Sequence, residues 1–124
     1  MKLRVLDNTI RLRVTKSELA DIAEHGWVES SVQFGGGAAL IYRLESGPAD
    51  APAAGFADGR IVVTLPAGRV AQWAATDEVA ISGAQALDGG AALEILVEKD
   101  FECLEPRPGE DPRDLFDNPK KSGS

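Results

Sequence analysis

The sequence predicts an α+β fold built from two β-β-α-β-β units that pack about a pseudo-twofold axis. One observation is a repeat, since residues 36–45 and residues 89–98 are identical at six of ten positions. The other is that a shift of 51 residues aligns the apolar pattern of the preceding segments, placing Leu12 on Val63 and Leu19 on Val70. Neither half carries enough apolar surface to stand comfortably alone. We therefore expect the halves to pack as antiparallel sheets or as a barrel, with two helices.

Two strands joined by a tight turn are predicted at the start of the chain, over residues 3–6 and 9–14. In the second strand Ile10, Leu12 and Val14 alternate with Arg11 and Arg13, which predicts one buried and one exposed face. The residues between the two strands, Asp and Asn, tolerate the positive φ that a two-residue hairpin turn requires.

A helix is predicted to begin after Thr15, because Thr15 and Glu18 have the spacing of a capping box. Leu19 and Ile22 then fall on one face at helical spacing. His25 and Gly26 are suited to the C-terminal end, where a cation faces the last carbonyls and glycine accepts a left-handed conformation. Strands are expected over residues 27–34 and 40–44, with glycines 35–37 turning the chain between them.

The second unit repeats these signals. Asp58-Gly59 is a strong two-residue turn at the place where the first unit has Asp7-Asn8, and Trp73 falls on the buried helix face in place of Ile22. Strands beginning at Val79 and covering residues 93–97 complete it. We expect a single globular domain over residues 1–104, with repeat 1 at about 1–45, a linker at 46–54 and repeat 2 at about 55–104.

Residues 105–124 are predicted to be a disordered acidic tail, because they are rich in proline, charge and small side chains. Leu115 and Phe116 are the apolar exceptions. Two alternatives stay open for them: they dock on the domain or on a partner, or they are simply exposed.

The charge balance bounds the choice of partners. The net charge of −7 disfavours nucleic acid, yet five basic residues lie within the first sixteen positions: Lys2, Arg4, Arg11, Arg13 and Lys16. No run of apolar residues is long enough for a membrane helix, so no membrane association is expected. Cys103 is the sole cysteine and excludes an internal disulfide, which favours a cytoplasmic location.

The sequence contains no recognisable catalytic set. One histidine and one cysteine cannot form a structural zinc site, and the glycines at 35–37 precede a strand rather than the lysine and helix of a phosphate-binding loop. We therefore expect no metal and no cofactor.

Two functional hypotheses follow. The first is a non-enzymatic binding or regulatory module in which Arg11 and Arg13, with Lys16 and Arg43, present a basic strand face to an anionic protein, a small anionic ligand or the chain's own tail. The second is a small enzyme or ligand-binding protein with a pocket between the repeats. The residues assigned to that pocket are Trp27, Tyr42, His25, Lys99 and Asp100. The oligomeric state is left open.

Two segments, residues 10–19 and residues 96–104, resemble the best-marked motifs of a family of small uncharacterised bacterial proteins, a domain of unknown function. The resemblance implies no activity. It implies that the marked positions of the family include Arg11, Arg13, Lys16, Glu18, Lys99, Asp100, Phe101 and Cys103.

Overall fold

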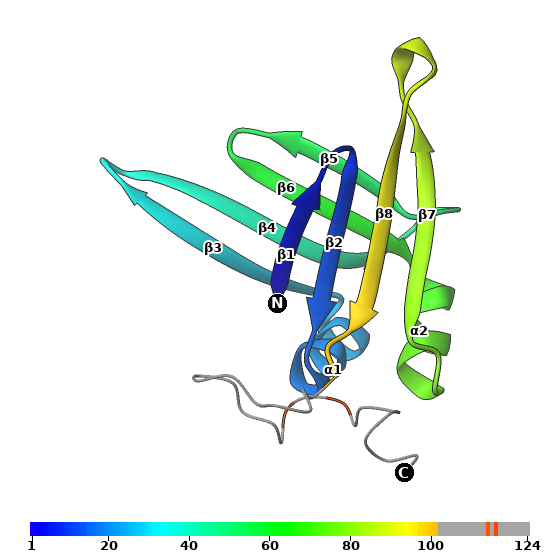
Figure 1. Ribbon diagram of the computed structural model, residues 1–124. Coiled ribbons are helices and arrows are strands. Elements are labelled where there is room, and N and C mark those ends of the chain that lie inside the picture. The colour runs from blue at the N-terminus through cyan, green and yellow to red at the C-terminus, as the bar shows by residue number, and fades with distance from the viewer. Residues whose placement is uncertain (102–113, 115, 117–124) are drawn as a thin grey trace.

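The computed structural model describes residues 1–101 together with Asp114 and Phe116. Its elements follow one another in the predicted order, β-β-α-β-β twice, with a 3-10 turn before the last strand (Figure 1). The first unit comprises β1 (Lys2–Leu6), β2 (Thr9–Val14), α1 (Lys16–His25), β3 (Trp27–Gly35) and β4 (Ala38–Gly47). The second comprises β5 (Ala53–Ala57), β6 (Arg60–Pro66), α2 (Ala67–Ala75), β7 (Ala80–Ala86), η1 (Asp88–Gly90) and β8 (Ala92–Lys99).

The strands form two separate four-stranded sheets. Sheet A has the order β1-β2-β8-β7 and sheet B the order β3-β4-β6-β5, so each sheet takes one hairpin from each unit. This arrangement is compatible with duplicated units. The predicted α+β class is confirmed, whereas the barrel alternative is wrong, because the sheets do not close on each other.

The expectation of purely antiparallel sheets also needs correction. Each hairpin is antiparallel, but the strands that join the two units, β2 with β8 and β4 with β6, run parallel. The tight turns fix only the local pairs. No short-range signal specifies which distant strand completes a sheet, so the sequence pattern does not predict the parallel pairs β2–β8 and β4–β6.

The turns and caps form for the predicted reasons. Asp7 and Asp58 both have positive φ, 49° and 52°, at corresponding hairpin turns. Thr15 caps α1 through a complete capping box with Glu18, and Gly26 ends the helix at φ 95°, donating its N–H to the Ile22 carbonyl.

The core lies between the inner faces of the two sheets, with both helices at one end (Figure 1). Most of its buried apolar residues occupy corresponding positions of the two units. They are Leu12, Val14, Leu19, Ile22 and Leu44 in the first, and Val63, Leu65, Val70, Trp73, Ile81, Ile95 and Val97 in the second. Trp73 is the largest, and its indole Nε1 donates to the Val79 carbonyl at 3.1 Å. The polar atom of this ring is thereby satisfied inside the core.

Two hairpins extend beyond this core. The β3–β4 hairpin projects to one side of sheet A, and the β7–β8 hairpin projects from the end opposite the helices (Figure 1). Val32 on the first and Leu87 on the second are accordingly 41% and 39% exposed.

Candidate functional site

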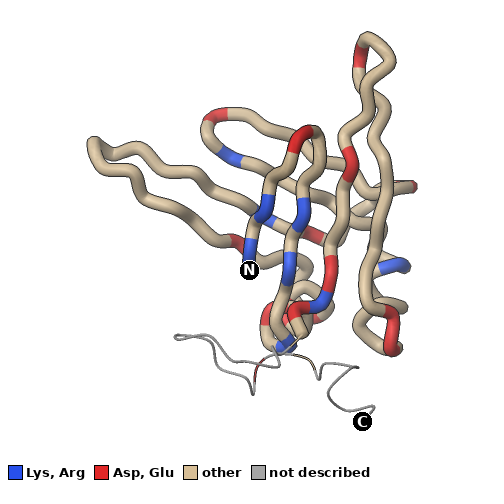
Figure 2. Tube along the Cα trace, in the orientation of Figure 1, with Lys and Arg blue, Asp and Glu red and all other residues tan. Residues whose placement is uncertain are grey.

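Four basic side chains lie on the outer face of the β1–β2 hairpin, and we call this set the basic face: Lys2, Arg4, Arg11 and Arg13. The strand register puts Lys2 opposite Arg13 and Arg4 opposite Arg11, so like charges face each other directly. Figure 2 shows these positions grouped on neighbouring strands. With Leu3, they line a depression of about 270 Å³. Cross-strand pairs of like charge are unfavourable for folding, so the fold itself does not call for this arrangement.

One carboxylate, Glu98 of β8, holds two of the four cations. Its Oε1 accepts hydrogen bonds from Arg11 Nε at 2.7 Å and from Arg13 Nε at 2.6 Å. Burial by itself raises the pKa of Glu98, but the hydrogen bonds from Arg11 and Arg13 outweigh it, and the net shift of the pKa is downward. The carboxylate therefore fixes both guanidinium groups through Nε, while their terminal nitrogens, the usual bidentate donors to oxyanions, are not used in these two bonds.

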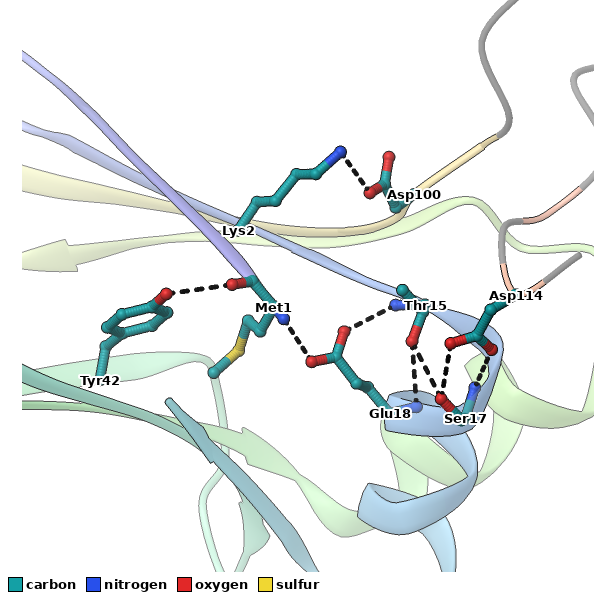
Figure 3. Close-up of polar contacts among 8 residues, drawn as sticks. All are labelled: Met1, Lys2, Thr15, Ser17, Glu18, Tyr42, Asp100 and Asp114. Carbon is teal, nitrogen blue, oxygen red and sulfur yellow. Dashed lines mark hydrogen bonds and ion pairs between the residues drawn. The ribbon is translucent and has the colours of Figure 1, made fainter. Parts of the chain in front are cut away.

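Lys2 pairs instead with Asp100, which follows β8. The Lys2 Nζ lies 2.9 Å from the carboxylate, and Asp100 is almost wholly buried (Figure 3). Arg4 forms no ion pair with any residue in the described part of the chain. The basic face thus includes Arg4, an exposed cation with no charged partner among the described residues, beside two arginines that share one carboxylate.

Asp100 and Lys99 belong to a junction where the end of sheet A meets α1 and residues near the C-terminus. The Asp100 N–H donates to the Val14 carbonyl at 2.8 Å, and the Asp100 carbonyl accepts from the Phe116 N–H at 3.0 Å. Lys99 Nζ donates to the Thr76 carbonyl at 2.8 Å and lies 5.3 Å from the centre of the Phe116 ring. The two adjacent side chains therefore point to different partners.

The start of α1 is tied to both ends of the described chain (Figure 3). Glu18 completes the capping box with Thr15 and also pairs with the Met1 amino group. Asp114 accepts hydrogen bonds from the Ser17 N–H at 3.1 Å and the Ser17 hydroxyl at 2.8 Å. An acidic residue at this position interacts favourably with the helix dipole and uses a backbone donor that the helix leaves free.

Phe116 packs against the hydrophobic core, and its ring meets that of Phe101 edge-on at 6.0 Å. Phe116 is therefore in contact with the domain, as one of the two alternatives for the apolar tail residues expects. Cys103, Leu115 and the tail residues other than Asp114 and Phe116 lie outside the described residues.

Trp27 and Arg43 lie on the outer face of sheet B, away from the basic face. The Arg43 guanidinium stacks 4.3 Å from the Trp27 ring centre and pairs with Glu45 at 2.9 Å. Glu29 on the neighbouring strand pairs with Arg60 at 2.5 Å. Two cations are balanced by two carboxylates here, so this face does not share the excess charge of sheet A.

The remaining predicted residues are dispersed. His25 is exposed at the end of α1, 3.9 Å from the carboxylate of Glu24, and Lys16 is exposed at the start of the same helix. The Tyr42 hydroxyl donates to the Met1 carbonyl at 3.1 Å (Figure 3). The structure therefore brings Arg11 and Arg13 together at Glu98, and Asp100 lies nearby through its ion pair with Lys2, the residue opposite Arg13. The residues assigned to a pocket do not come together.

A concave site does exist between the hairpins β1–β2 and β5–β6, with a volume of about 280 Å³. Val5, Ile10, Phe56, Ile61 and Leu93 give it a mainly apolar lining, and none of the residues predicted for a pocket lines it. Among the described residues, no group of three or more histidine, cysteine or acidic side chains is placed to hold a metal ion. In the same part of the chain, no helix is both long and apolar enough to cross a membrane.

Sequence reasoning did not include Lys2 and Arg4 among the site residues. The available signal was their i, i+2 spacing beside a predicted turn, which puts both side chains on the same face as Arg11 and Arg13. The partner of the arginines, Glu98, could not be found this way because it comes from a strand more than eighty positions away.

The profile of a family of unknown function matches residues 1–120. The chain belongs to DUF7009. This family assignment carries no activity with it. No curated protein and no solved structure matches the chain.

Proposed function

We propose that the protein is a binding module that uses the basic face to hold an anionic partner. The observation that carries this proposal is the pairing of like charges across β1 and β2, Lys2 with Arg13 and Arg4 with Arg11. Such pairs reduce the stability of a hairpin by a few tenths of a kcal/mol up to about 1 kcal/mol. A bound anion would offset that cost.

The local charges support binding despite the acidic net charge of the protein. Glu98 orients Arg11 and Arg13 through their Nε atoms, which leaves the terminal guanidinium nitrogens for a ligand. Arg4 adds a third cation that has no ion pair among the described residues. Preorganised arginines recognise carboxylate or phosphate oxygens with little loss of side-chain entropy.

The test uses a fluorescein-labelled polyglutamate peptide and measures its binding by anisotropy at several salt concentrations. The variant is Arg4→Glu with Arg11→Glu, and the matched control is Arg43→Glu with Arg60→Glu on sheet B, which changes the net charge equally. We expect the first variant to weaken binding by about tenfold or more and to flatten the salt dependence, and the control to change it by less than about threefold.

Arg11→Glu removes a bond to Glu98, so the single variant Arg4→Glu serves as a folding control. Arg4→Glu should weaken binding without lowering the thermal melting temperature, because Arg4 contributes no ion pair within the described chain and the new carboxylate faces Arg11 in place of a like charge. Equal losses in the two double variants would show that only net charge matters, and the proposal would then be wrong.

A further inference from the structure

The free edges of the two sheets differ at corresponding positions. Leu3 of β1 pairs with Leu12, and Ala54 of β5 pairs with Val63 in the same antiparallel register. The Ala54 N–H donates to the Gln85 side chain of β7 at 2.7 Å, so it points away from β6 and is occupied. By the alternation of an antiparallel pair, the N–H of Leu3 points away from β2 in the same manner.

At β1 this outward N–H has no partner among the described residues. Gln85, which serves the edge of β5, pairs with Leu93 on its own hairpin. The corresponding pair on the β3–β4 hairpin is Val32 with Leu40, and valine offers no acceptor. Val5, two residues after Leu3, presents its backbone outward by the same alternation, so no described residue pairs with the outward hydrogen-bonding edge of β1.

One face of the β3–β4 hairpin lies beside this edge. The bond from the Tyr42 hydroxyl to the Met1 carbonyl places the start of β1 over the Tyr42–Ser30 pair of the β3–β4 hairpin. The next pair toward the tip, Leu40 with Val32, shares that face, and Figure 1 shows the hairpin running on past β1. Val32 is 41% exposed. A strand added at β1 would cover it.

We propose that the edge of β1 accepts an extended segment of a partner protein as a fifth strand of sheet A, a segment in which acidic and apolar residues alternate. Its acidic side chains would lie on the outer side, beside Lys2 and Arg4, and its apolar side chains would rest on Val32 and Leu40. This inference rests on the proposed function, because it states how an anionic partner reaches the basic face. Strand addition supplies main-chain hydrogen bonds, while alternate side chains supply specificity.

The positive charge of β1 favours an acidic partner segment over the β1 strand of a second copy of the chain. Pairing β1 with another β1 would bring Lys2 and Arg4 beside the same cations of the partner, which is unfavourable. Basic residues on an edge strand are a recognised means of preventing such self-association. An acidic segment turns the same charges into an attraction.

The experiment uses the full chain and a fluorescein-labelled peptide of alternating glutamate and valine, with binding followed by anisotropy. Val5→Pro removes an outward N–H without removing a β1–β2 hydrogen bond, and proline is tolerated on edge strands in this orientation. Val5→Ala, which keeps the N–H, is the matched control. We expect Val5→Pro to weaken binding by about tenfold and Val5→Ala by less than about threefold, with melting curves reporting that both variants fold.

A second measurement leaves the protein unchanged. The peptide is N-methylated either at every valine or at every glutamate, and only one of these sets of amides can face β1 in an added strand. We expect one methylated peptide to lose binding and the other to keep it. A peptide of the same composition with its glutamates and valines in two blocks should bind at least about tenfold more weakly than the alternating one.

The inference is overturned if the alternating peptide fails to bind, if both methylated peptides bind like the parent, or if a folded Val5→Pro variant binds normally. These outcomes are separate from the failure of the proposed function. Polyglutamate binding that depends on Arg4 and Arg11 but not on the Val5 N–H would keep the basic face and reject the added strand. If substitution of Arg4 and Arg11 leaves binding of the alternating peptide unchanged, both the proposed function of the basic face and the added strand are contradicted.

Discussion

The outer faces of sheets A and B have the same strand layout but a different balance of charge. In sheet A, Glu98 of β8 lies next to Arg13 of β2 in the parallel register, and in sheet B, Glu45 of β4 lies next to Thr64 of β6 in the corresponding register. Glu98 bonds to two arginines of its neighbouring strand, whereas Glu45 bonds to Arg43 of its own strand and to Thr64.

Sheet B shows that the arginines of sheet A are not a requirement of the architecture. The positions that correspond to Arg11 and Arg13 are Val62 and Thr64, and sheet B forms with them. In sheet B, Arg43 and Arg60 are matched by Glu29 and Glu45, so that face is electrically balanced. The excess of cations in sheet A is therefore a feature that the architecture does not require, and the proposed anionic partner would make use of it.

The largest expected effect comes from making sheet B resemble sheet A. Val62→Arg combined with Thr64→Arg adds two cations beside Glu45, at the positions that correspond to the arginines of the basic face. We expect polyglutamate affinity to rise by about tenfold at low salt and the gain to disappear as salt is added. Anisotropy titrations measure this, and Gln72→Arg combined with Ala20→Arg at exposed helix positions, which adds the same net charge, is the control. An equal gain in affinity for the control variant would show that net charge, and not the position on the strand, determines binding.

A smaller effect separates the two glutamates. Glu98→Gln leaves two arginines with a neutral partner, whereas Glu45→Gln affects one arginine and a hydroxyl. After allowance for solvent screening, we expect Glu98→Gln to lower the free energy of unfolding by about 1 kcal/mol and Glu45→Gln by about half of that. Urea denaturation measures both.

The ion pairs of Glu98 with Arg11 and Arg13 predict that stability depends on pH. The pKa of Glu98 is lower in the folded state than its ordinary value, so its contribution to stability is complete above the unfolded pKa of about 4.3 and is lost as the pH falls through the lower folded pKa. Below that range, wild type and Glu98→Gln should have similar stability. A difference that persists unchanged to pH 2 would argue against the ion pairs as its source.

The smallest effect concerns Trp27, which stacks on Arg43 in sheet B. Trp27→Leu keeps apolar bulk and removes the cation–π contact, so we expect a loss of stability of about 0.5 kcal/mol and no change in polyglutamate binding. Chemical denaturation and anisotropy measure the two quantities. A loss of binding would place part of the ligand site on sheet B and erase the contrast between the faces.

The element order and the local motifs could be predicted because their causes are local. The turn at Asp58, the capping box of Thr15 and Glu18, and the stop at Gly26 each depend on a few neighbouring residues, and the structure contains all three. The pairing of β2 with β8 depends on distant segments. Alternation tells which side chains face inward, but not which strand lies alongside.

The candidate site follows the same rule. Arg11 and Arg13 were predicted to share an outer face because they are two residues apart in one strand, and they do. The hypothesis of a pocket around Trp27, His25 and Lys99 depends on a cleft between the two units. In the structure these residues lie on different elements and have different partners. Closeness in space across units requires the tertiary topology, which the single sequence does not contain.

The parallel joints between the units bear on the order in which the chain can fold during synthesis. Thr9 and Glu94 are neighbours in sheet A, so β2 is made long before the strand that completes its pairing. The first hairpin emerges from the ribosome with the β8-facing edge of β2 unpaired, and this edge stays unpaired until β8 has been translated. Until β8 emerges, the nascent chain therefore carries an unpaired edge on β2.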